Sequence, residues 1–87
     1  MTDKKRTKIT VNIYKKNYTI VGSESKERVE EIAKLVDEKM NDIYQGNKNL
    51  DTTRLAVLTA INTMNDYLKL KDEYDELITL IEEEDKN

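Results

Sequence analysis

Few side chains in this sequence have the chemistry that catalysis needs. Histidine and cysteine are absent, which removes the commonest general base, the thiolate nucleophile and the usual zinc ligands. Serine occurs only as Ser23 and Ser25, and the two glycines cannot form a phosphate-binding loop. The adjacent carboxylates Glu30 and Glu31 fall on the polar side of a predicted helix. We therefore expect no enzyme, no cofactor and no metal site.

Basic side chains remain as candidates for binding an anionic partner. They are concentrated near the N-terminus, whereas the C-terminal end is acidic and the net charge is −3. Proteins that bind single-stranded nucleic acid combine a strongly basic groove with aromatic side chains for base stacking, and this acidic chain does not. We interpret the basic arm first as a solvated terminus, second as a contact for an acidic protein and third as a nucleic-acid contact. The cationic residues of this region are Lys4, Lys5, Arg6, Lys8, Lys15 and Lys16.

A small polar cluster lies among apolar residues near the middle of a predicted long helix. It consists of Asn62, Asn65 and Asp66. Because buried polar groups are normally hydrogen-bonded, a contact between packed helices is one interpretation. Contact with a partner protein is the other, and the sequence leaves both open.

The sequence contains no apolar run of the length that spans a bilayer. Residues 1–8 are polar where a signal peptide would become hydrophobic. We therefore expect a cytoplasmic location and no membrane partner.

A β-hairpin is the first element that would position these side chains. Residues 8–14 alternate between apolar and polar, with Ile9, Val11 and Ile13 on one face. Residues 18–21 alternate again and are followed by a glycine, so we predict a hairpin over residues 8–21. A two-stranded hairpin is marginal in water, so a helix, a neighbouring chain or both must cover it.

A helix is predicted over residues 23–45. Ser23 and Ser25 are both candidate N-caps, and apolar residues then recur at helical spacing. Gly46 is expected to adopt the left-handed conformation that commonly ends a helix, and residues 46–51 to form a loop.

A second, much longer helix is predicted from residue 52 to about residue 84. Asp51 is its candidate N-cap, and no proline or glycine interrupts it over roughly 50 Å. One row of residues recurs at alternating steps of four and three, which is a heptad pattern. Such a row is buried only when it packs against another helix. The chain is therefore expected to work as an oligomer. This row, called the seam below, consists of Ala56, Ala60, Thr63, Tyr67, Leu70, Tyr74, Leu77 and Ile81.

The long helix changes character along its length. A second row beside the seam is apolar in the first half and polar further on, at Lys71 and Asp75. The first half is therefore expected to pack on several sides inside a head, and the second half to protrude as a coiled coil. The fold class is predicted as α+β, with a head of a β-hairpin plus one helix followed by a long C-terminal helix. The predicted head covers 1–66, with arm 1–7, hairpin 8–21, helix 23–45, loop 46–51 and helical segment 52–66, and the coiled-coil extension with its acidic end covers 67–87.

Five stretches of the sequence together match a known pattern. They are 8–14 (KITVNIY), 18–22 (YTIVG), 29–40 (VEEIAKLVDEKM), 50–62 (LDTTRLAVLTAIN) and 66–70 (DYLKL). These stretches resemble the ZapA family of bacterial cell-division proteins, in the short form of Gram-positive bacteria, and the resemblance covers essentially residues 8 to 81. It implies a non-enzymatic, cytoplasmic protein that binds polymers of the tubulin-like GTPase FtsZ and bundles them at the midcell ring.

The resemblance also implies an assembly and a binding site. In the family, heads pair into dimers, and the C-terminal helices join two dimers through a coiled coil. Charged residues of the head and of the loop between its helices contact FtsZ, which corresponds most directly to Lys48 and Arg54 and more loosely to Lys15, Lys16 and Lys39.

Two departures from the family pattern affect these expectations. Lys15 follows Tyr14 where the family often has glycine, so the hairpin turn is expected to be wider or of another type. The long helix is shorter than in long members, so a dimer is more strongly implied than a tetramer. Two other interpretations stay open, namely a coiled-coil adaptor that binds a helix at the seam and a small nucleic-acid-binding dimer that uses the basic hairpin.

Overall fold

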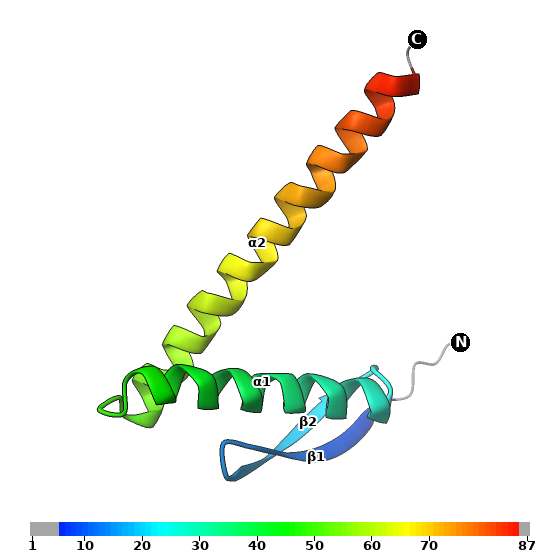
Figure 1. Cartoon of the computed structure of the whole chain (residues 1–87). Helices are drawn as coiled ribbons and strands as arrows, with labels where there is room; N and C mark the ends of the chain where they lie inside the picture. Colours follow the sequence, from blue (N-terminus) through cyan, green and yellow to red (C-terminus); the bar gives the residue numbers. More distant parts are fainter. Residues whose placement is uncertain (1–5, 86–87) are drawn as a thin grey trace.

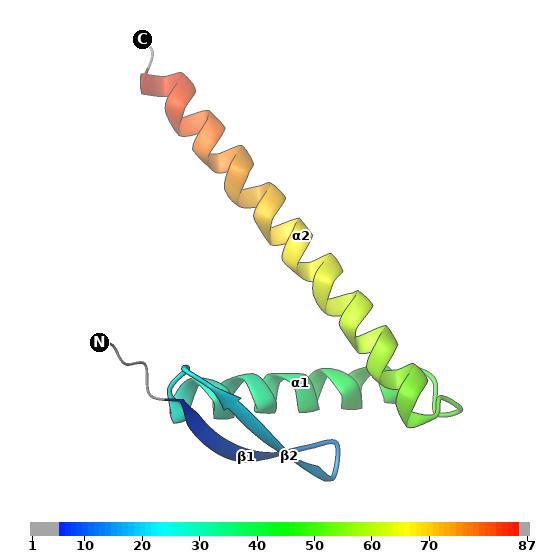
Figure 2. The ribbon, with the colours of Figure 1, turned by 180° about the vertical axis from the view of Figure 1, so that it is seen from behind.

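The computed structural model describes residues 6–85, so residues 1–5 of the predicted basic arm and residues 86–87 of the acidic end lie outside it. Two strands are followed by two helices, in the order β1, β2, α1, α2 (Figure 1). The hairpin lies along α1, and α2 leaves the far end of α1 as a single projecting helix (Figure 2). The predicted architecture of a hairpin, a helix and a long C-terminal helix is confirmed.

The hairpin consists of β1 (Thr7–Ile13) and β2 (Lys16–Gly22), which pair antiparallel over their full length. Ile9 lies opposite Ile20, so apolar side chains of both strands share one face of the sheet. The other face carries polar cross-strand hydrogen bonds, Thr10 with Thr19 at 3.2 Å and Asn12 with Asn17 at 3.0 Å.

The strands are joined by a tight turn of two residues. Tyr14 has a φ of 50° and Lys15 a φ of 70°, and positive φ at both central residues is what a type I′ hairpin turn requires. The turn is therefore not wider than usual, since β2 already begins at Lys16. The backbone N–H of Tyr14 donates to Asp37 Oδ1 at 2.7 Å, which anchors the turn to the following helix.

Lys15→Gly is expected to raise the free energy of unfolding by about 1 kcal/mol, because glycine adopts positive φ without the steric cost that lysine has. Urea denaturation at a fixed protein concentration measures the change. Lys16→Gly is the matched control, since it removes the same side chain from a strand position and is expected to lower stability. Equal destabilisation by both substitutions would contradict the assignment of strain to Lys15.

Helix α1 (Lys26–Gly46) begins at Ser25, whose Oγ accepts a hydrogen bond from the N–H of Arg28 at 3.1 Å. Of the two candidate caps, Ser25 is therefore the one used. The prediction of a left-handed Gly46 is wrong, because no glycine among residues 6–85 has positive φ. The helix instead ends at Asn47, an extended residue whose N–H donates to the carbonyl oxygens of Ile43 and Tyr44 at 3.3 and 3.1 Å.

Helix α2 (Thr52–Asp85) has 34 residues, which gives it a length of about 50 Å. Asp51 caps it as predicted, because its Oδ1 accepts a hydrogen bond from the N–H of Arg54 at 2.8 Å. None of the helices within residues 6–85 is long and apolar enough to cross a membrane.

The core is small and divided between two places. In the first, Ile9 and Val11 of β1 pack with Val29 and Ala33 of α1, and the half-buried Ile13 packs beside them. The other buried side chains belong to α1 and α2, which contact each other, and they are Met40, Leu55 and Thr59. The hairpin is therefore held by α1, whereas α2 is held only near its start.

Candidate functional site

The seam of α2 is exposed along its whole length in the single chain. Of the residues of α2, only Leu55 and Thr59 are buried. Leu70 is 66% exposed and Ile81 is 47% exposed. The remaining members, all exposed as well, are Ala56, Ala60, Thr63, Tyr67, Tyr74 and Leu77.

The second apolar row on the first half of α2 is exposed too. The sequence indicated that this half packs on several sides, yet one chain covers neither row. The row consists of Val57, Ile61, Met64 and Leu68, each more than half exposed. A continuous apolar surface of this extent is typical of an interaction site in a soluble protein.

A third apolar surface lies between β2 and α1. Because Ile20 is paired with Ile9 and Tyr18 with Val11, both β2 side chains are on the face of the hairpin that α1 packs against. The helix covers β1 but leaves Tyr18 44% and Ile20 38% exposed. A shallow groove of about 150 Å³, almost wholly apolar, results. Its lining, called the β2 groove below, consists of Val11, Ile13, Ile20, Glu24, Val29, Ile32 and Ala33.

The five basic residues expected to contact a partner are not equivalent in the structure. Lys15 is in the hairpin turn, Lys16 begins β2, Lys48 is in the loop between the helices and Arg54 is in the first turn of α2, and all four are exposed. Within residues 6–85, none of these four forms an ion pair.

The hairpin turn and the loop lie towards the same end of α1. Tyr14 of the turn contacts Tyr44 near the C-terminus of α1, with ring centroids 6.3 Å apart in an edge-to-face arrangement. The structure therefore brings the turn, with Lys15, towards the end of the head that carries Lys48.

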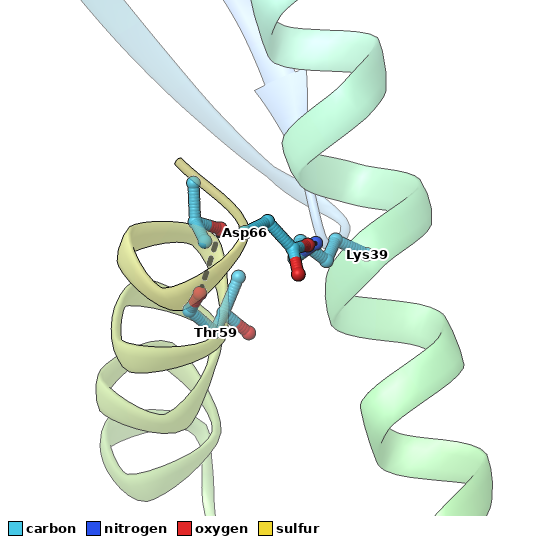
Figure 3. A network of polar contacts seen from close by, with 4 residues as sticks. Lys39, Thr59 and Asp66 are labelled. Atoms are coloured by element: carbon cyan, nitrogen blue, oxygen red, sulfur yellow. Dashed lines mark hydrogen bonds and ion pairs between the residues drawn. The ribbon is translucent and has the colours of Figure 1, made fainter. Parts of the chain in front are cut away.

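Lys39 differs from the other four because it is engaged within the chain. Its Nζ donates to Asp66 Oδ2 at 2.5 Å, so the two side chains form an ion pair between α1 and α2 (Figure 3). The Lys39 side chain is 28% exposed and that of Asp66 is 55% exposed. The polar cluster had two interpretations, a contact between packed helices and a contact with a partner protein. For Asp66 the structure shows the first of them.

The ion pair changes the acidity of Asp66. The hydrogen bond from Lys39, and next the charge of Lys39, lower the pKa of the Asp66 carboxyl below 3.8. A carboxyl with a depressed pKa contributes its stabilisation above the unfolded-state value and loses it as the pH falls through the folded-state value. The contact between the helices should therefore persist at neutral pH and weaken only in acid.

Carbon-detected NMR of the side-chain carboxyl is expected to give Asp66 a titration midpoint below 3.8. Lys39→Met keeps an apolar stem but removes the ammonium, so it is expected to raise that midpoint. A midpoint that does not respond to Lys39→Met would show that the two side chains are not paired in solution.

Asp37 is a structural residue that the sequence interpretation missed. The side chain of Asp37 is half-buried and accepts the hydrogen bond from the backbone N–H of Tyr14. Its spacing provided a signal, because Asp37 is four residues after the buried Ala33 and three before the buried Met40. A carboxylate on the buried stripe of a helix normally has a donor to bind.

The arrangement offers surfaces for binding. In the part of the chain that the structure describes, no three acidic side chains are grouped so that they could hold a metal ion. The chain presents two apolar rows, one apolar groove and four exposed basic side chains at the turn, the start of β2, the loop and the start of α2.

Comparison with known proteins gives consistent matches. The family model described as cell division protein ZapA matches residues 9–86. A protein of Oceanobacillus iheyensis named cell division protein ZapA is similar to this chain, with 52% identity over 98% of this chain and 99% of the relative. The Bacillus subtilis relative has 45% identity, over 98% of this chain and 100% of its own length.

A solved structure is similar as well. It is described as a ZapA mutant dimer from Geobacillus stearothermophilus, with a TM-score of 0.73 and 41% identity, and the match covers 94% of this chain and 95% of that one.

Proposed function

Because the chain belongs to the ZapA family of cell-division proteins, we propose that it binds FtsZ polymers and cross-links them to stabilise the midcell ring. It does so without enzymatic activity, as a cytoplasmic protein concentrated at the division site. The observation that carries the proposal is the pair of exposed apolar rows on α2, which one chain cannot cover. A chain that self-associates there presents several heads at once.

Self-association is supported by the surfaces and by the dimeric relative of known structure. The seam residues Ala56, Ala60, Thr63, Tyr67, Leu70, Tyr74, Leu77 and Ile81 form the helix contact, and the second row on residues 57–68 adds to it close to the head. The β2 groove is a third apolar surface, and in this proposal the second copy covers it. We place the head at residues 1–66 and the coiled-coil extension at 67–87, and expect a homodimer that pairs further into a tetramer.

Cross-linking follows from multivalency. Each head contacts a filament weakly, but two heads on one rigid helical spacer meet a repeating lattice, and the second contact then gains a high effective concentration. Helix α2, about 50 Å long, is the proposed spacer between the heads.

In this proposal the head contacts FtsZ through the basic residues Lys48 and Arg54, and Lys15 and Lys16 of the hairpin add to the contact. Support comes from their exposure, from the absence of ion pairs to them within residues 6–85, and from the position of the hairpin turn towards the same end of α1. Lys39 is the weakest of the five candidates, because Asp66 already holds its ammonium group.

Reversing the charge at both central positions, Lys48→Glu with Arg54→Glu, is expected to weaken binding to FtsZ polymers about tenfold, equivalent to about 1.4 kcal/mol. Co-sedimentation with polymerised FtsZ at several salt concentrations measures the loss. Lys26→Glu with Lys34→Glu is the matched control, because it changes the net charge equally at exposed positions of α1. Equal loss in both variants would mean a general charge effect, and no loss in the first would remove the proposed site.

A further inference from the structure

We propose that the ion pair between Lys39 and Asp66 sets the angle between α1 and α2, and thereby the direction in which the long helix leaves the head. The pair is a positioning device for the assembly. Its effect on head spacing along filaments rests on the proposed function, but its effect on the angle does not.

Apolar packing fixes α2 only near its start. Leu55, with 0% exposure, is the fourth residue of the helix, and Thr59 follows one turn later with 5% exposure. From residue 60 onward, no residue of α2 is buried within the described part of the chain. Contacts so close to the loop hold the helix at one end and restrict its rotation weakly.

The space between the two helices further from the loop is open. A cleft of about 390 Å³ lies there and is lined by Leu35, Val36, Glu38, Lys39, Asp42 and Thr63. Because Thr63 is the one residue of α2 that lines this cleft, packing within a single chain does not define one interhelix angle there. Something else must distinguish between neighbouring angles.

The ion pair lies away from the loop along both helices, where one contact can constrain the angle between them. Lys39 lies seven residues before the last residue of α1, about 10 Å from the loop along that helix, and Asp66 lies fourteen residues after the first residue of α2, about 21 Å from the loop. Figure 3 shows the two side chains meeting from facing helices. The loop and the ion pair thus join α1 and α2 at two separate points, which defines an angle.

No other ion pair among residues 6–85 joins different elements. Arg28 with Glu31 lies within α1, and Lys71 with Asp75 lies within α2. Thr59 and Thr63, next to the pair, donate their hydroxyl hydrogens to carbonyl oxygens of α2 itself, at 2.8 and 2.7 Å. They therefore do not connect the helices.

A small change of angle has a large effect at the end of α2. Glu83 lies about 45 Å from the start of the helix, so a rotation of about 10° would move it by about 8 Å. A dimer or tetramer built on such helices would carry that displacement into the separation of its heads.

Distances between spin labels test the proposal without any partner protein. The chain has no cysteine, so Glu27→Cys and Glu83→Cys introduce unique labels on the exposed head and on α2. Glu83 is two residues after Ile81, which places it nearly on the opposite side of the helix from that seam residue. A label there points away from the seam. Labelled protein is mixed with excess unlabelled protein, so that distances within one chain dominate.

Asp66→Asn is expected to broaden the distance distribution and shift its mean by several ångströms, about the displacement that a rotation of 10° gives. Asp75→Asn is the matched control, because it removes the same charge from an ion pair within α2, and it should leave the distribution unchanged. The exchanged variant Lys39→Asp with Asp66→Lys should restore the narrow distribution.

An unchanged distribution in Asp66→Asn, with helix content preserved by circular dichroism, would overturn the proposal. Failure of the exchanged variant to restore the distribution while Asp66→Asn broadens it would also overturn it, because the effect would then come from packing. FtsZ is absent from the distance measurement. A chain that did not bind FtsZ could therefore still show the change of angle, and a chain without the change of angle could still bind FtsZ.

Discussion

Leu70→Glu is expected to weaken self-association about a thousandfold. Leu70 is central in the seam and is 66% exposed in the single chain, so a second copy is what covers it in the oligomer. Burying a carboxylate without a partner costs several kcal/mol per ion, and about 4 kcal/mol corresponds to a thousandfold change in the dissociation constant. Sedimentation equilibrium of the variant measures that change.

Thr79→Glu is the control for the seam variant. It adds the same charge to α2, but Thr79 lies two residues after Leu77 and two before Ile81, on the side of the helix away from the seam. Its association should match that of the unchanged protein. If Leu70→Glu associated as tightly as Thr79→Glu, the seam would not be the helix contact.

Leu55→Ala is expected to cost about 3 to 5 kcal/mol of folding free energy. Leu55 is the one large side chain, among the residues described, with less than 2% exposure, and leucine-to-alanine substitutions at such sites combine lost transfer energy with a cavity. The total stability of a domain of this size is about 4 to 13 kcal/mol, so much of it would be lost. Urea denaturation followed by circular dichroism measures the change.

Leu58→Ala separates packing within the chain from packing between copies. Leu58 is three residues further along the same helix and is 40% exposed. Its cost should be smaller and should decrease on dilution, since in the proposed oligomer a second copy covers the exposed part of its side chain. A Leu55→Ala cost as small as that of Leu58→Ala would contradict the assignment of Leu55 to the core of the head.

Local chemistry made the elements of the fold predictable. Alternation in residues 8–14 and helical spacing from residue 29 onward depend on periods that the backbone itself imposes. The cap at Asp51 was predictable for the same reason, because the acceptor and the N–H that it binds are three residues apart. Only the details of the hairpin turn and of the end of α1 differed.

Contacts between elements were not predictable in this way. The end of α1 uses Asn47, whose N–H donates to the carbonyl oxygens of Ile43 and Tyr44, and Gly46 does not adopt a left-handed conformation. Asp37 and Lys39 are paired with residues 23 and 27 positions away, and a single sequence does not specify which distant donor a carboxylate will meet. The same limit applies to the β2 groove, which depends on how far α1 lies across the sheet.

The functional surfaces were predictable in unequal degree. The seam followed from the heptad spacing alone, and the structure leaves it uncovered. The basic residues had no such pattern, and only the folded chain distinguishes the paired Lys39 from the exposed Lys48 and Arg54.

The decisive measurement for the proposed function is co-sedimentation with FtsZ polymerised by GTP, read by negative-stain electron microscopy beside an unpolymerised GDP control. We expect the chain to pellet with polymers and to gather them into bundles. A chain truncated after Lys71 should still bind polymers but no longer bundle them, because the head remains while most of the extension is lost. Absence of the full-length chain from the polymer pellet, at a normal oligomer mass, would refute binding to FtsZ polymers.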